Sequence, residues 1–184
     1  MKFTNLTIDQ FQRIAAIEMT ADEAIKKVAI YAVVKGISFH EAKKVSMSSL
    51  NSEVKKIESQ LKSIPPIIYK ERIKVNGKRY KLTLFTDKLT AGQLLEILSY
   101  NLTNEYEVIQ SLHKVMATLA RERAWFGLKK YDAENHAKRA EEFRQHCTMG
   151  QVWGAASFFL MASEIFLQNI PKFLEAMMKT TDKG

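Results

Sequence analysis

The stretch YKERIKVNGKRYKLTLFTDKLTAGQLLEIL, residues 69–98, contains both kinds of secondary structure that the chain predicts. In its first half, apolar and polar residues alternate on both sides of Asn76-Gly77. This dipeptide is a strong signal for a tight β-hairpin, because both central turn residues take positive φ. In its second half, Thr90 and Gln93 have the spacing of a capping box, which begins a helix. The sequence therefore predicts a β-hairpin followed by a helix over about 91–101.

A turn at Asn76-Gly77 fixes which residues face each other across the hairpin. It pairs Ile73 with Tyr80 and Tyr69 with Leu84, and it places these four side chains on one face. The opposite face then carries five basic residues: Lys70, Arg72, Lys74, Arg79 and Lys81. Like charges directly opposite one another destabilise a strand pair, so this face predicts either a solvated surface or contact with an anionic one. These five residues are the candidate partner-binding residues of the chain.

The composition is that of a folded protein with an excess of positive charge. The chain has 184 residues, of which 46% are hydrophobic and 26% charged, and its net charge is +8. Between Lys62 and Lys88 there are eight basic and two acidic residues, so most of the excess lies in the hairpin region. Such a concentration favours an anionic partner. The single cysteine, Cys147, excludes an internal disulfide and fits a reducing cytosol.

Helical periodicity and capping residues predict that most of the remaining chain is helical. Three further capping boxes are expected at Thr7 with Gln10, Thr20 with Glu23, and Ser38 with Glu41. Gly36 is a plausible helix stop, and Asp132 and Thr148 are expected N-caps. The other predicted helices span 48–62, 104–122, 132–146 and 149–169, with a short one after Pro171.

Pro65-Pro66 breaks the helical pattern and suggests a boundary between two parts. The predicted fold class is mainly α with one β-hairpin (α+β). Residues 1–64 form a small N-terminal helical lobe, and residues 65–184 form the basic hairpin and a C-terminal helical bundle. The start of the chain lacks the apolar run of a secretory signal. The most apolar run, 152–170, is interrupted by Glu164 and Gln168, so we expect a buried core helix, not a membrane span.

No residue pattern indicates a cofactor, a metal or catalysis. The LTAGQ segment has one glycine and lacks both the P-loop and the dinucleotide-binding patterns. The histidines (His40, His113, His136 and His146) and Cys147 do not show the paired spacing of a zinc site. A Cys–His pair for nucleophilic catalysis needs spatial proximity that a sequence does not show. Glu164 is expected to pair with an arginine of the segment 120–125 or to face an interface. We therefore predict no enzyme activity, and no catalytic, cofactor-binding or metal-binding residues.

The hairpin and the helix after it resemble proteins of tail morphogenesis in tailed bacteriophages. In that group, a helix start of the form T-x-G-Q, followed by two hydrophobic residues and an acidic one, comes after a β-segment. Here it reads Thr90, Gly92, Gln93, Leu94, Leu95 and Glu96. The resemblance continues with a helix that carries SLHKVMATLA and with a hydrophobic helix of the GAASFFLMA type. The chain resembles the tail-assembly chaperones and also small virion-associated proteins of crAss-like phages, whose opening is similar to LTIDQFQRIAAIE and whose hairpin is similar to VNGKRYKL. It departs from the group at Leu94 and Glu96, where phenylalanine and aspartate are usual, and in LARERAWFGLKKYD, which replaces a proline-containing loop.

The resemblance implies a non-enzymatic structural or assembly protein of a virion, made in the host cytoplasm. Such a protein would pack against other virion proteins and copies of itself in the head–tail or tail assembly, without a membrane. The methionine content, eight residues, suits an adaptable contact surface or a plain core equally. A transient tail-assembly chaperone, absent from the finished particle, is one alternative. A non-specific nucleic-acid-binding protein that uses the basic hairpin is a second, although no aromatic residues alternate with the basic ones on its face.

Overall fold

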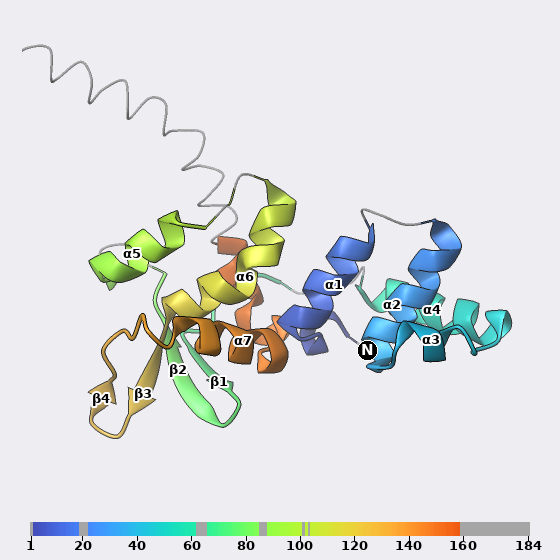
Figure 1. The fold of residues 1–184 in the computed structure, drawn as a ribbon. Helices are drawn as coiled ribbons and strands as arrows, with labels where there is room; N and C mark the ends of the chain where they lie inside the picture. Colours follow the sequence, from blue (N-terminus) through green and yellow to red (C-terminus); the bar gives the residue numbers. More distant parts are fainter. Residues whose placement is uncertain are drawn as a thin grey trace, which may run out of the picture.

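A computed structural model describes residues 2–18, 22–61, 66–84, 88–100, 102 and 104–158 of the chain. Within these ranges the fold is mainly helical, with one small antiparallel sheet, which confirms the predicted class (Figure 1). The helices are η1 (Phe3–Asn5), α1 (Ile8–Glu18), α2 (Glu23–Lys35), α3 (Phe39–Ala42), α4 (Met47–Leu61), α5 (Ala91–Leu98), α6 (Glu105–Leu119) and α7 (His136–His146). Residues 149–158 are also helical. The strands are β1 (Arg72–Val75), β2 (Lys78–Leu82), β3 (Ala120–Ala124) and β4 (Gly127–Leu128).

The predicted first hairpin forms with the predicted register. Asn76 and Gly77 both have positive φ, and β1 pairs with β2 so that Ile73 faces Tyr80, Lys74 faces Arg79 and Arg72 faces Lys81. The predicted pairing of Tyr69 with Leu84 is wrong, because β1 begins only at Arg72. The hydroxyl of Tyr69 instead donates a hydrogen bond to the carbonyl of Leu82, at 2.7 Å.

The sheet is larger than one hairpin. Residues 120–128, predicted as the end of a helix and a loop, form β3 and β4, and β3 pairs with β2 to give the strand order β1-β2-β3-β4. The helix predicted over 104–122 therefore ends at Leu119. The sequence ARERA consists of good helix formers, but here the free edge of β2 supplies hydrogen-bond partners that convert it to a strand.

Two other helix starts differ from the prediction. Asp22, instead of Thr20, caps α2, because its side chain accepts hydrogen bonds from the backbone of Ala24 and Ile25. Asp132 does not cap α7; its carboxylate accepts from the backbone of Asn135, and α7 begins after that residue. The capping boxes at Thr7–Gln10 and Ser38–Glu41 form as predicted, and Gly36 ends α2 in the left-handed conformation.

The main core lies between the sheet and the helices α1, α6, α7 and 149–158. Its fully buried members include Tyr80, Met116 and Phe143. The N-terminal segment is fixed into this core by backbone hydrogen bonds from Ile8 to the carbonyl of Cys147 and from Met149 to that of Leu6.

The helices α2 to α4 lie at one end of the molecule, beyond α1 (Figure 1). Their own buried side chains include Ile30, Val33, Leu50, Val54 and Ile57. The predicted boundary at Pro65 lies outside the described residues, as do Glu164, Pro171 and the predicted helix beyond residue 158.

Candidate functional site

The polar side chains of the T-x-G-Q segment hold the start of α5. Thr90 accepts a hydrogen bond from the backbone of Gln93 at 3.3 Å, and Thr90 donates its own backbone N–H to the Gln93 side chain at 3.1 Å. The other end of the Gln93 amide, which is fully buried, donates to the carbonyl of Thr118 on α6 at 2.6 Å. One glutamine therefore caps α5 and attaches its start to α6.

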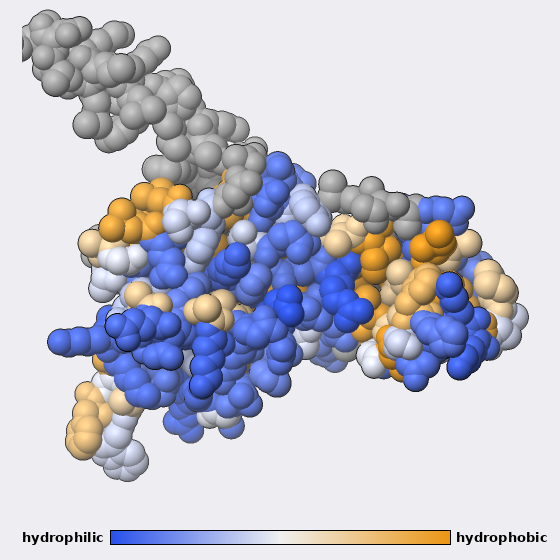
Figure 2. Space-filling view, in the orientation of Figure 1, coloured by the Kyte–Doolittle hydropathy of each residue, from blue (hydrophilic) through white to orange (hydrophobic). Residues whose placement is uncertain are grey.

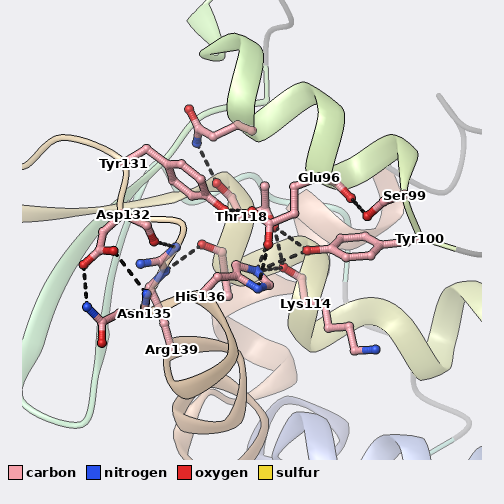
Figure 3. Close-up of polar contacts among 12 residues, drawn as sticks. Glu96, Ser99, Tyr100, Lys114, Thr118, Tyr131, Asp132, Asn135, His136 and Arg139 are labelled. Atoms are coloured by element: carbon pink, nitrogen blue, oxygen red, sulfur yellow. Dashed lines mark hydrogen bonds and ion pairs between the residues drawn. The ribbon is translucent and has the colours of Figure 1, made fainter.

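A polar cluster holds the rest of α5, as Figure 3 shows. The Glu96 carboxylate lies 2.9 Å from Nδ1 of His136 on α7 and accepts a hydrogen bond from the hydroxyl of Tyr131. Nε2 of the same imidazole lies 2.9 Å from the hydroxyl of Thr118 and 3.2 Å from that of Tyr100. The cluster therefore joins α5, α6 and α7.

The order Thr118, His136, Glu96 has the pairings of a hydroxyl–imidazole–carboxylate catalytic group. The Thr118 side chain, however, is fully buried, and its hydroxyl donates to the carbonyl of Lys114 one turn earlier in α6, at 3.0 Å. Burial lowers the pKa of His136, and the Glu96 carboxylate opposes that shift. This geometry favours a structural role: the cluster positions α5.

The outer face of α5 is apolar. Leu94, Leu95 and Leu98 are 40%, 68% and 56% exposed. Figure 2 shows hydrophobic surface over this helix. Gln93 and Glu96 of the T-x-G-Q-L-L-E segment thus face inward and hold the helix, while its two leucines face solvent.

Four of the five predicted basic residues lie on the face of the sheet that points away from the core, and Lys70 does not. Arg72, Lys74 and Arg79 are exposed and make no ion pair with the residues that the structure describes. Lys81 pairs with Glu71 at 2.8 Å. Lys70 precedes the strand, and its ammonium donates to the carbonyl of Gly150 at 2.7 Å.

The second hairpin extends this basic face across a third strand. The register places Arg121 beside Lys81, which itself faces Arg72. Arg123 is two residues further along β3, and alternation puts it on the same face. Neither arginine was predicted as a site residue, because Arg121 was expected at the end of a helix and Arg123 in the loop after it.

The turn of the second hairpin carries two aromatic side chains that contact almost nothing. Trp125 is 94% exposed and Phe126 is 97% exposed. Gly127 follows at φ 132°, a conformation that favours glycine. Both hairpin turns lie at the same end of the sheet, and the β3–β4 turn projects from the body (Figures 1 and 2). A glycine directly after two aromatics, following alternating ARERA, is the sequence signal that could have revealed this turn.

The side of the sheet that faces α7 has a polar cleft of about 270 Å³. Four of its cations have partners: Lys78 pairs with Glu142 at 3.0 Å, Lys129 pairs with Glu122, and the side chains of Arg121 and Arg139 donate to the carbonyls of Lys129 and Ala117. Lys130 and Lys138 also line the cleft. A second cavity, of about 150 Å³, lies between α1, α6 and the helix 149–158 and is lined by apolar side chains. Neither cavity gathers a set of groups with an obvious chemical role.

The histidines and the cysteine lie in separate environments. No group of three potential metal ligands occurs among the described residues. Cys147 is fully buried at the end of α7, and burial raises its pKa to about 12. His113 on α6 accepts a hydrogen bond from the buried amide of Gln12 on α1, at 2.9 Å.

Within the described ranges, no helix is both long and apolar enough to cross a membrane. Comparison of the chain with protein-family models, with curated proteins and with solved structures found no match.

Proposed function

We propose that this chain is a non-enzymatic structural or assembly protein of a tailed bacteriophage, which acts by packing against other virion proteins or copies of itself. The observation that carries the proposal is the construction of α5. Buried polar side chains hold this helix on α6 and α7, and three leucines lie on its open face. Exposed apolar side chains that gather on one rigid element are typical of a protein contact surface.

The phage setting rests on the resemblance of Thr90, Gly92, Gln93, Leu94, Leu95 and Glu96 to the helix start of tail-morphogenesis proteins. Some residues of that segment hold the helix and others are exposed on it, which suits a contact element. Gln93 and Glu96 fix the helix, and Leu94 and Leu95 remain available to a partner. The protein would be made in the host cytoplasm and incorporated into the virion.

The experiment that tests the role is quantitative mass spectrometry of purified, nuclease-treated particles of the phage that encodes the chain. We expect its peptides at a fixed ratio to those of the portal protein. Abundance in infected-cell lysate with absence from particles would contradict a virion role and support the chaperone alternative. Absence of any effect on particle assembly when the gene is deleted would contradict both.

A variant tests whether α5 is the contact element. Leu95→Lys places a charge on the most exposed of the three leucines, so we expect a folded protein that no longer enters particles. Lys55→Leu, at an exposed position of α4, is the control and should be incorporated normally. Normal incorporation of Leu95→Lys would remove α5 from the proposal.

A further inference from the structure

The outer face of the sheet concentrates like charges in a way that costs stability in the isolated protein. Arg72, Lys81 and Arg121 lie side by side across three strands, and Lys74 faces Arg79 in the next row. Like charges directly opposite one another destabilise a sheet. Of these five, only Lys81 has an ion-pair partner among the described residues, Glu71. A polyanion on this face would relieve the repulsion.

The aromatic turn stands next to the row of Lys74 and Arg79. Because β2 and β3 are antiparallel, the end of β2 near Arg79 is also the end at which β3 reaches Trp125 and Phe126. Side chains stand roughly perpendicular to a sheet, whereas the turn extends along its strands. A single ligand that contacts both the basic face and the aromatic turn must therefore lie along the face and continue past the end of the hairpin.

We propose that this basic face and the Trp125–Phe126 turn together bind single-stranded nucleic acid. The phosphates would follow the rows of arginine and lysine, and unstacked bases would lie on the two exposed rings. A basic groove combined with aromatic platforms is the usual construction of sites for single strands. The sequence argued against this function because the basic hairpin has no aromatic residues among its basic ones. The second hairpin supplies two aromatic side chains next to it.

Other polyanions satisfy only part of this surface. A duplex offers phosphates to the basic rows, but its bases are stacked and leave both rings without a partner. An anionic membrane could accept the two aromatic side chains of the turn. The side chains of Arg72, Lys81 and Arg121 would then point into water, parallel to the membrane surface, and would not contact the lipid headgroups. An acidic protein surface offers carboxylates but no repeated planar groups.

The test is fluorescence anisotropy with the full chain and a labelled oligothymidine of about 20 nucleotides. We expect binding that weakens steeply between about 50 and 200 mM salt. The double variant Trp125→Ala/Phe126→Ala should weaken binding roughly 10- to 100-fold without changing the salt slope, because stacking is not a counterion effect. Trp125→Phe retains a ring and should bind within a few-fold of the parent protein.

Charge reversal addresses the other half of the site. Lys74→Glu/Arg79→Glu should lower the affinity by more than tenfold and reduce the salt slope by roughly 1.4, the value for two lost phosphate contacts. Lys44→Glu/Lys55→Glu makes the same change in net charge on exposed residues of the opposite end of the molecule and is the matched control. It should retain most of the binding. Circular dichroism of each variant establishes that the fold is intact.

Four outcomes would overturn the proposal. They are equal affinity for a duplex of the same length, unchanged affinity in Trp125→Ala/Phe126→Ala, a loss of affinity in Lys44→Glu/Lys55→Glu equal to that in Lys74→Glu/Arg79→Glu, or no binding of either nucleic acid. Binding to anionic vesicles alone, or to an acidic protein alone, would assign the surface to that partner instead. The proposal does not depend on the assembly role of α5. Leu95→Lys should bind the oligonucleotide normally, and Trp125→Ala/Phe126→Ala should still enter particles, because its α5 is unchanged.

Discussion

At the scale of single residues, one close backbone crossing in the fold depends on a glycine. A Cβ atom at Gly154 would lie 2.2 Å from the carbonyl oxygen of Ile68, which is much shorter than real contacts of this kind. Gly154 therefore lets the chain that leads into β1 cross directly over the helix 149–158. Gly92 in the first turn of α5 has no such neighbour, since the nearest atom to its Cβ would be 4.0 Å away.

These two glycines give a matched pair of substitutions. Gly154→Ala should destabilise the protein by about 2–3 kcal/mol or more, because the blocking atom belongs to the backbone and the crossing must open. Gly92→Ala should be neutral or stabilise by about 0.5–1 kcal/mol, because alanine favours a helix. Urea denaturation measures both changes. Equal effects of the two substitutions would show that the crossing at residue 154 is not tight.

His113 makes the stability of the α1–α6 contact depend on pH. Burial lowers its pKa from the usual 6.5 to about 4, so the folded protein holds the ring neutral and able to accept from Gln12. As the pH falls below 6.5, the unfolded chain takes up this proton before the folded one does. The contribution of His113 to the free energy of unfolding is therefore fully present above pH 6.5. It falls between pH 6.5 and pH 4, by up to about 1.4 kcal/mol per pH unit.

The measurement is the free energy of unfolding at pH 7 and pH 5 for the parent protein and for His113→Gln. Glutamine can accept the same hydrogen bond but does not titrate, so the variant should lose less stability between the two pH values. The comparison removes the contribution of other groups, including His136. An identical pH dependence in both proteins would show that His113 does not control it.

At the scale of elements, the predictable parts were those whose information is local. Three capping boxes, the Asn76-Gly77 turn and the glycine stop at Gly36 involve residues within a few positions of one another, and all formed as expected. The second hairpin was not predictable in this way. Residues 120–124 become a strand because β2, about forty positions earlier, offers them a free edge.

The residues of the candidate site likewise fall into those that local sequence predicts and those that only non-local pairing brings together. Arg72, Lys74 and Arg79 were identified because a two-residue turn determines the faces of its own hairpin. Trp125 and Phe126 were missed, since only the non-local pairing of β3 places them at the same end of the sheet. The cluster around Glu96 and His136 was also missed, because its members come from three different elements.

Attachment of α5 through one buried amide gives an element-scale prediction. Gln93→Ala removes a helix cap and leaves the carbonyl of Thr118 without its 2.6 Å partner, so it should cost about 2–3 kcal/mol. The loss should appear as faster amide hydrogen exchange across residues 91–98. Leu95→Ala, on the open face of the same helix, should change stability by no more than about 0.5 kcal/mol. Uniformly faster exchange throughout the chain in Gln93→Ala would mean that α5 is not a separately attached unit.

At the scale of the whole molecule, the fold has a main core and a smaller one that meet at α1. The buried residues of α2 and α4, such as Ile30 and Val54, are not part of the cluster formed by the sheet and α5–α7. The side chain of Gln10 on α1 donates to the carbonyl of Val33 on α2, at 3.1 Å, which helps to join the two groups. Such an arrangement permits the smaller group to open without the larger one.

Native-state hydrogen exchange at increasing urea concentration should therefore reveal two opening reactions. Amides of α4 should exchange through an opening of lower free energy than amides of α6, because α4 packs on a smaller set of buried side chains. Val54→Ala should lower the first free energy and leave the second unchanged. If the amides of both helices converge on one opening free energy at every urea concentration, the protein unfolds as a single unit.

The short bridge between Thr7 and Thr148 also has a consequence for how the chain is made. Residues 3–8 leave the ribosome about 140 residues before the backbone groups that hold them, which corresponds to roughly ten seconds of synthesis. During that interval Phe3, Leu6 and Ile8 have no place to be buried, whereas α2 to α4 can already fold on themselves. The main core therefore closes later in synthesis than the α2–α4 group, and Phe3, Leu6 and Ile8 remain exposed until the segment around Thr148 has been made.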